Sequence, residues 1–114
     1  MHEYSLVEAL ISRVEAEARK RGALKVHGLS VRMGELAGVD PGLFQTAYDT
    51  FRAGTICAEV PLTLKQVAAT WSCPKCLAVI PRGQALQCER CRSPARLDEG
   101  GDALMLDGID LEVA

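Results

Sequence analysis

Aromatic residues are scarce in this chain of 114 residues, which has two Phe, two Tyr and one Trp. Aliphatic side chains must therefore supply most of the apolar area that folding buries. A chain of this length predicts one ordinary domain, or one domain that carries a small additional lobe.

A strong charge of one sign and a long apolar run are also lacking. The formal net charge of −2 gives no reason to expect nucleic acid or an acidic membrane as the main partner. No stretch approaches the roughly 20 apolar residues that a membrane span requires. Glu3 precedes any basic residue, and Glu8 and Arg13 interrupt the first apolar run, so we expect no signal peptide. With an odd number of cysteines, five, the chain is predicted to be cytoplasmic.

Four of the cysteines form two C-x-x-C pairs, Cys73 with Cys76 and Cys88 with Cys91, with eleven residues between the pairs. Each pair places two sulfurs on one tight turn, and two facing turns complete the tetrahedral sulfur set that zinc accepts. The gap is slightly shorter than in most zinc ribbons but leaves room for a small hairpin. The spacing therefore predicts a structural zinc site. Because a closed four-sulfur shell has no open coordination position, we expect no enzyme activity there.

Two other interpretations of the cysteine segment compete with a purely structural zinc site. A thiol–disulfide catalyst is disfavoured, because such proteins normally have one active C-x-x-C pair near a βαβ unit. A zinc-ribbon adaptor that binds nucleic acid or protein is the stronger alternative, since basic residues outnumber the single Glu89 between residues 71 and 97. The basic residues are Lys75, Arg82, Arg90, Arg92 and Arg96. Compensation of the thiolate charge is favoured over nucleic-acid binding, because stacking aromatic side chains are scarce.

Hydrophobic periodicity predicts two helices and three strands outside the cysteine segment. The expected elements are a helix over 5–21 that stops at Gly22, a strand over 26–33, a helix from Asp40 to Gly54, a strand over 60–67 and a final strand over 103–113. Ser5 and Glu8 match a capping box at the first helix start. Asp40 followed by Pro41 is a typical N-cap and first helical position for the second helix.

The final strand has no helix of its own and must pair with an earlier strand. We therefore expect an α+β fold in which two helices lie on a three-stranded sheet, with a zinc-ribbon-like lobe of four cysteines inserted between two strands. Residues 1–70 and 98–114 would form one domain and residues 71–97 the other. The acidic segment 98–102 is expected to be a flexible linker, and a bulge at Asp107 and Gly108 is expected in the last strand.

His27 and Cys57 are expected to have ordinary structural roles. Alternation along the strand over 26–33 places His27 on the same side as Leu29, Val31 and Met33, and we assign it no ligand role. Cys57 is outside the two pairs and is expected to be a small buried hydrophobic residue.

The amino-terminal triplet Met1, His2 and Glu3 forms a second candidate metal site. Met1 offers its α-amino nitrogen, His2 its backbone amide nitrogen and imidazole, and Glu3 a backbone nitrogen or a carboxylate oxygen. Nitrogen-rich ligation in a tetragonal or square-planar arrangement suits Ni(II) or Cu(II), and protons compete for these nitrogens, so binding should weaken on acidification. From the triplet alone, a surface histidine on a frayed terminus is the simpler interpretation.

Several segments together have the sequence pattern of a known family. They are Met1–Glu3, VRMGELAGVDP over 31–41, FRAGT over 51–55, the two C-x-x-C pairs and IDLE over 109–112. On these motifs the chain resembles, over nearly its whole length, the HypA/HybF family of hydrogenase-maturation nickel metallochaperones. Family members commonly have glycine just after the second cysteine of each pair, where this chain has Leu77 and Arg92. These two positions are therefore expected to strain the turns or to change them.

The resemblance implies a nickel-binding α/β domain and a separate zinc domain. It assigns nickel to Met1, His2 and Glu3, and zinc to the four paired cysteines. It also implies a role: a carrier that delivers Ni(II) to the large-subunit precursor of [NiFe]-hydrogenase together with the GTPase HypB and, in some organisms, serves urease and its accessory proteins. Members of the family are monomers or homodimers.

Overall fold

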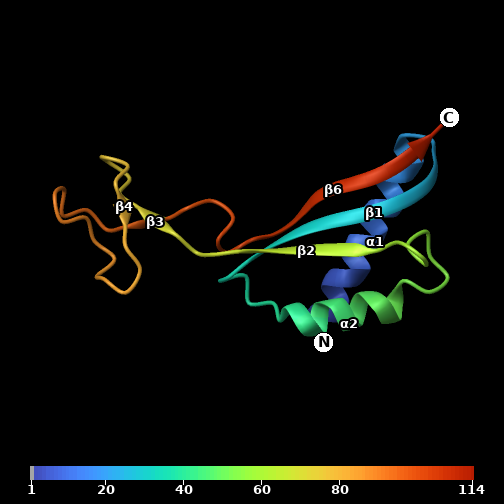
Figure 1. Cartoon of the computed structure of the whole chain (residues 1–114), viewed down its shortest axis with the longest axis horizontal. Helices are drawn as coiled ribbons and strands as arrows, with labels where there is room; N and C mark the ends of the chain where they lie inside the picture. The colour runs from blue at the N-terminus through green and yellow to red at the C-terminus, as the bar shows by residue number, and fades with distance from the viewer. Residues whose placement is uncertain (1) are drawn as a thin grey trace.

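The computed structural model describes residues 2–114, which form an elongated molecule of 54 × 31 × 17 Å. Figure 1 shows a larger part that holds α1 and α2 and a smaller part that holds β3 and β4. The elements are α1 His2–Lys20, β1 Ala23–Gly34, α2 Pro41–Phe51, β2 Leu62–Val67, β3 Trp71–Ser72, β4 Val79–Ile80, β5 Arg96–Leu97 and β6 Leu104–Val113. Neither helix in the described range is long and apolar enough to cross a membrane.

The three long strands form one sheet, called here the main sheet, in the order β2-β1-β6. β1 pairs in parallel with β2 and antiparallel with β6. The parallel pair requires a crossover connection, which α2 supplies. Because the cysteine segment lies between β2 and β6 along the chain, the predicted insertion between two strands of one small sheet is confirmed, as is the α+β fold.

Helix α1 begins at His2, so the prediction that Ser5 caps its start is wrong. Tertiary contacts hold the extra turn in place. The rings of Tyr4 and Phe51 meet edge to face with centroids 4.9 Å apart. The carboxylate of Glu3 accepts a hydrogen bond of 3.3 Å from the backbone N–H of Asp40. These contacts override the local capping preference.

Helix α2 begins as predicted, with Asp40 as its N-cap and Pro41 as its first residue. The carboxylate of Asp40 accepts a hydrogen bond of 3.0 Å from the backbone N–H of Leu43. The apolar side chains of this helix are only partly buried, since Leu43 is 54% exposed whereas Phe44 is fully buried. The core between the helices and the main sheet consists chiefly of aliphatic side chains, as the scarcity of aromatic residues predicts. Its buried members are Val7, Ile11, Val14, Ala18, Val26, Leu29, Met33, Phe44, Ala47, Tyr48, Cys57 and Val60.

Three register shifts interrupt the pairing of β1 with β6, and two of them bear on the sequence predictions. An extra residue in β1 between Val26 and Gly28 places Val26 in the core and His27 outside, where its Nε2 lies 2.9 Å from a carboxylate oxygen of Glu112. The prediction that His27 shares a side with Leu29 is therefore wrong, because a bulge reverses the alternation. The predicted bulge in β6 is confirmed at Asp107.

Segment 98–102 is an ordered turn and not the flexible linker that its composition predicts. The carboxylate of Asp98 accepts hydrogen bonds from the hydroxyls of Thr70, at 2.6 Å, and Ser72, at 2.7 Å. These bonds hold the pKa of Asp98 below its usual value. Asp98 also donates its backbone N–H to the carbonyl of Thr70 at 2.8 Å. The two chain segments that lead into and out of the cysteine lobe, defined as residues 71–97, are thereby bonded to each other.

A bidentate ion pair joins the cysteine lobe to the end of β1. Arg82 places one guanidinium nitrogen 2.7 Å from Oε1 of Glu35 and the other 2.9 Å from Oε2. The same guanidinium donates to the carbonyl of Ala69 at 2.9 Å, and Glu35 accepts from the N–H of Ala69 at 2.8 Å. The Arg82 hydrogen bonds are the main reason that the pKa of Glu35 falls to about 2. This arrangement fixes where the lobe meets the main sheet.

Gly34→Ala should destabilise the protein by roughly 1–3 kcal/mol, the usual cost of overpacking. A Cβ at residue 34 would lie closer than 3.0 Å to backbone atoms of Gly100 and Gly101, which cannot rotate away. Chemical denaturation of the metal-loaded protein measures the loss. Gly108→Ala is the control, because a Cβ there meets nothing within 4 Å. Equal effects of the two substitutions would show that the close approach is not what makes residue 34 sensitive.

The Glu35–Arg82 contact should open as the pH falls from about 4.5 to about 2. The pKa of Glu35 in the folded protein is about 2 and its reference value is 4.5. The stabilisation from ionised Glu35 is therefore complete above the reference pKa of 4.5 and is lost as the pH falls through the folded-state pKa of about 2. Amide NMR of residues 34–36 and 80–83 should show this transition in the parent and not in Glu35→Gln. Because thiolate protonation also releases metal in acid, Glu99→Gln, which alters an exposed carboxylate nearby, provides the baseline.

Candidate metal centre

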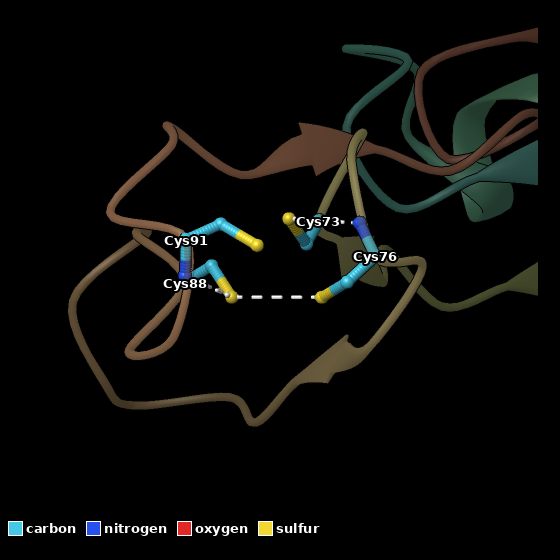
Figure 2. A group of neighbouring side chains, drawn as sticks. All are labelled: Cys73, Cys76, Cys88 and Cys91. Carbon is cyan, nitrogen blue, oxygen red and sulfur yellow. Dashed lines mark hydrogen bonds between the residues drawn. The ribbon is translucent and has the colours of Figure 1, made fainter.

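The four paired cysteines converge within the cysteine lobe. The short strands of the lobe form a second sheet in the order β4-β3-β5. The backbone N–H of Cys73 closes its turn by donating to the carbonyl of Ala78 at 2.9 Å. The backbone N–H of Cys88 likewise donates to the carbonyl of Ser93 at 3.0 Å. Figure 2 shows the two pairs facing each other with all four sulfurs directed inward. The sulfurs all lie within 4.8 Å of one another. The sequence prediction that these four residues come together is thus met by the geometry.

The spacing of the sulfurs fits a tetrahedral ion. A zinc–sulfur bond of about 2.3 Å gives a sulfur–sulfur edge of about 3.8 Å in a regular tetrahedron. The sulfurs of Cys76 and Cys88 are 3.8 Å apart. Cys73 and Cys88 are buried, whereas Cys76 is exposed, so the site lies at the surface of the lobe with two ligands anchored beneath it.

Backbone N–H groups of each turn point at the first sulfur of the pair. Cys73 accepts from the amides of Lys75, at 3.4 Å, and Cys76, at 3.5 Å, and Cys88 accepts from the amide of Cys91 at 3.4 Å. The hydrogen bond from the Cys76 amide is the main reason that the pKa of Cys73 falls to about 6. This bonding favours a thiolate at Cys73 even before a cation is present.

The close sulfurs also disfavour one another's ionised form when no cation is bound. The hydrogen bond with the Cys76 side chain is the main cause that raises the pKa of Cys91 to about 12, and the charges of Cys73 and Cys76 add to it. Four thiolates at this distance therefore require a positive ion among them. A divalent ion with thiolate preference meets that requirement, and zinc is such an ion.

The residue after each C-x-x-C pair adopts the left-handed conformation that favours glycine. Leu77 has φ 64° and Arg92 has φ 59°. Each donates its backbone N–H to the carbonyl of the first cysteine of its pair, Cys73 or Cys88, at 2.9 Å. The turns therefore keep the geometry that glycine usually supports, and the two side chains are strained within it.

The basic residues of the cysteine lobe do not act as one group. Arg82 forms an ion pair with Glu35 at the end of β1. Its contacts therefore do not support the prediction that it compensates the negative charge of the thiolates. Its engagement also removes one of the four arginines that a nucleic-acid-binding surface would use. No sequence signal marked Glu35 and Arg82 as partners, because they are 47 residues apart and each is an ordinary charged residue by itself.

The two described residues of the amino-terminal triplet belong to the first turn of α1, in the larger part of the molecule. His2 is exposed, and the carboxylate of Glu3 is held by the amide of Asp40. Met1, which the sequence assigns to the same site, lies outside the described residues. Cys57 is fully buried beside Tyr48, and burial raises the pKa of its thiol, in line with the structural role predicted for it.

A four-cysteine cluster with tetrahedral spacing, carried on a small α+β scaffold, defines a metal-binding protein. A family model described as "Hydrogenase/urease nickel incorporation, metallochaperone, hypA" matches residues 1–111. The chain belongs to this family, whose members are metallochaperones and not enzymes.

Similar proteins agree with this assignment in sequence and in structure. A hydrogenase maturation factor HypA from Wolinella succinogenes is 34% identical over 114 residues, covering 98% of this chain and 96% of the relative. A factor of the same name from Shewanella oneidensis is 33% identical over 116 residues, covering 100% and 98%. The solution structure of the Ni metallochaperone HypA from Helicobacter pylori is 28% identical with a TM-score of 0.73, covering 98% of each chain. Another HypA solution structure is 29% identical with a TM-score of 0.78, covering 100% and 98%.

Leu77→Gly should strengthen metal binding by the cysteine cluster by up to about fivefold, because a non-glycine residue in the left-handed region costs about 1 kcal/mol. Competition with a chromophoric chelator measures the change. Leu77→Ala is the control, since it removes the exposed side chain and keeps the strained backbone. If alanine and glycine had the same effect, backbone strain would not be the cause.

Proposed function

We propose that this chain is a carrier that binds Ni(II) at its amino terminus and delivers it during maturation of [NiFe]-hydrogenase. The observation that carries the nickel site is the start of α1 at His2. The first four amide groups of a helix have no acceptor within the helix. The amide nitrogens of His2 and Glu3 are therefore free of helical hydrogen bonds and can serve as ligands without breaking any.

The proposed ligands are the α-amino nitrogen of Met1, the amide and imidazole nitrogens of His2, and a donor of Glu3. They form consecutive small chelate rings around one ion, with the nitrogen-rich set that Ni(II) favours. The contact between the Glu3 carboxylate and the Asp40 amide, 3.3 Å long, supports the backbone nitrogen as the Glu3 donor. An exposed site at a chain end also suits a carrier, because a partner can replace its ligands one at a time.

The four cysteines are proposed to hold a structural zinc ion. The 3.8 Å distance between two of the sulfurs and the amide groups directed at Cys73 and Cys88 support this assignment. When bound, zinc would supply the positive charge that lets four thiolates coexist, and much of the folding free energy of the lobe. Residues 71–97 are accordingly proposed as a zinc domain, and residues 1–70 with 98–114 as the nickel-binding domain.

Delivery is proposed to follow ligand exchange with a partner that approaches α1. The resemblance to the family makes the GTPase HypB and the hydrogenase large-subunit precursor the proposed partners, with urease maturation as a second destination. We place the protein in the cytoplasm, where these partners would assemble, as a monomer or homodimer. The alternative of a zinc-ribbon adaptor for nucleic acid gains no support from the contacts of Arg82.

One glycine added before Met1 should weaken Ni(II) binding by about tenfold or more, which is about 1.4 kcal/mol. The added residue converts the α-amine into an amide, which binds the ion only after losing its proton. Isothermal titration of the zinc-loaded protein with Ni(II) measures the effect, and zinc content should stay at about one ion per chain.

His2→Ala should abolish the same binding, whereas His27→Ala, which alters an exposed histidine paired with Glu112, should leave it intact. Unchanged affinity in the glycine-extended protein would refute the terminal site.

A further inference from the structure

The first turn of α1 is held by α2 at two separate points. A carboxylate oxygen of Glu3 accepts a hydrogen bond of 3.3 Å from the backbone N–H of Asp40, the residue that caps the start of α2. The ring of Tyr4 meets the ring of Phe51, the last residue of α2. A helix of 11 residues is about 16 Å long, so the two contacts lie at opposite ends of α2. Figure 1 shows the start of α1 beside α2.

The side chain of Phe51 contributes little to the buried core. It is 38% exposed, whereas Phe44 and Tyr48 of the same helix are fully buried. Its ring lies edge to face with that of Tyr4, with centroids 4.9 Å apart and an angle of 75° between the ring planes. Tyr4 is partly buried and packs against the core. Loss of the Phe51 ring should therefore act chiefly on Tyr4 and leave the core in place.

The later turns of α1 have their own anchors in the core. Val7, Ile11, Val14 and Ala18 are buried, and they follow one another at helical spacing. The helix begins at His2, five residues before Val7, and His2 is exposed. Helix ends fray unless something holds them. The order of the first turn therefore depends on its contacts with α2 more than the order of the later turns does.

Helical order in this turn bears directly on how its amide groups could bind one ion. In a helix the N–H groups all point toward the amino-terminal end, and those of the first turn have no acceptor within the helix. In an extended chain successive N–H groups point to opposite sides. The amides of His2 and Glu3 can therefore face one ion together when the turn is helical. A frayed turn has to be ordered before it can bind in this way.

We propose that Tyr4 and Phe51 are positioning residues of the amino-terminal nickel site. Their ring contact keeps the first turn of α1 helical, and the helical turn aligns the amide nitrogens of His2 and Glu3 toward the ion. This inference rests on the proposed function. Phe51 carries no ligand atom, so its effect on nickel passes through Tyr4. The apparent affinity of the site falls with the fraction of molecules in which the turn is ordered.

A double-mutant cycle on the two rings tests the contact, with isothermal titration of the zinc-loaded full chain with Ni(II). Tyr4→Leu and Phe51→Leu should each weaken nickel binding by roughly two- to tenfold, the range that an edge-to-face ring pair supplies. The double variant should be no weaker than either single variant, because the contact is already lost. Tyr4→Phe keeps the ring and should bind as the parent does. Additive losses would overturn the role of the ring contact.

NMR of the zinc-loaded protein without nickel supplies a readout that a general loss of stability would not move. In Phe51→Leu the helical Cα chemical shifts of residues 2–4 should move toward coil values, whereas those of residues 7–20 should stay as in the parent. Weaker nickel binding with an unchanged first turn would overturn the proposal, because the substitution would then act by another route.

Ile56→Ala is the matched control. Ile56 is 36% exposed, close to the value for Phe51, and lines a cavity with Lys25 and His27. It should leave nickel affinity unchanged, and a loss equal to that of Phe51→Leu would show that the ring contact is not the cause.

The glycine-extended protein separates failure of this inference from failure of the nickel site itself. Binding that survives the added glycine would refute the terminal site and the positioning role with it. Binding that is lost on extension but unchanged in Phe51→Leu would refute the positioning role alone.

Discussion

Strand β1 is the element on which the arrangement of the main sheet depends, because it pairs with β2 on one side and β6 on the other. The cysteine segment leaves the main sheet after β2 and returns at β6, so both ends of the lobe meet beside the end of β1. Gly34 ends β1, and its lack of a side chain admits the backbone of Gly100 and Gly101. Glu35 follows directly and binds Arg82 of the lobe. The central strand therefore organises the sheet and also positions the metal centre.

The two candidate metal sites differ in how accessible a bound ion would be, and a carrier needs this difference. The cysteine cluster is enclosed by two turns whose amides point at sulfur, and it has no position for a substrate ion or water once four sulfurs are bound. His2 and Glu3 of the amino-terminal triplet lie in the first turn of α1, where amide groups have no helical acceptors. A closed site suits a permanent structural ion, whereas an open site suits an ion that must leave. We propose zinc for the former and nickel for the latter.

The lobe is attached by polar contacts and not by an extensive apolar interface. The apolar core of the lobe is small, with Cys73, Ile80 and Cys88 buried in it. Asp98 ties the incoming and outgoing segments through Thr70 and Ser72. Such contacts are directional and partly exposed, so they set an orientation while contributing less to stability than an equal buried apolar area. A metal ion held by the four cysteines would then be the main source of stability inside the lobe.

Local sequence patterns determined much of this protein. The spacing of Cys73, Cys76, Cys88 and Cys91 predicted their convergence, since ligand spacing on tight turns is a local property, and Asp40 with Pro41 predicted the start of α2 for the same reason. The positive φ of Leu77 and Arg92 could be anticipated from the family resemblance alone. Tertiary structure decided the rest. The first turn of α1 depends on Phe51 and Asp40, the side on which His27 lies depends on a bulge against β6, and the Glu35–Arg82 pair joins residues far apart in the chain. Each of these depends on which distant segments meet, and composition and periodicity carry no information about that.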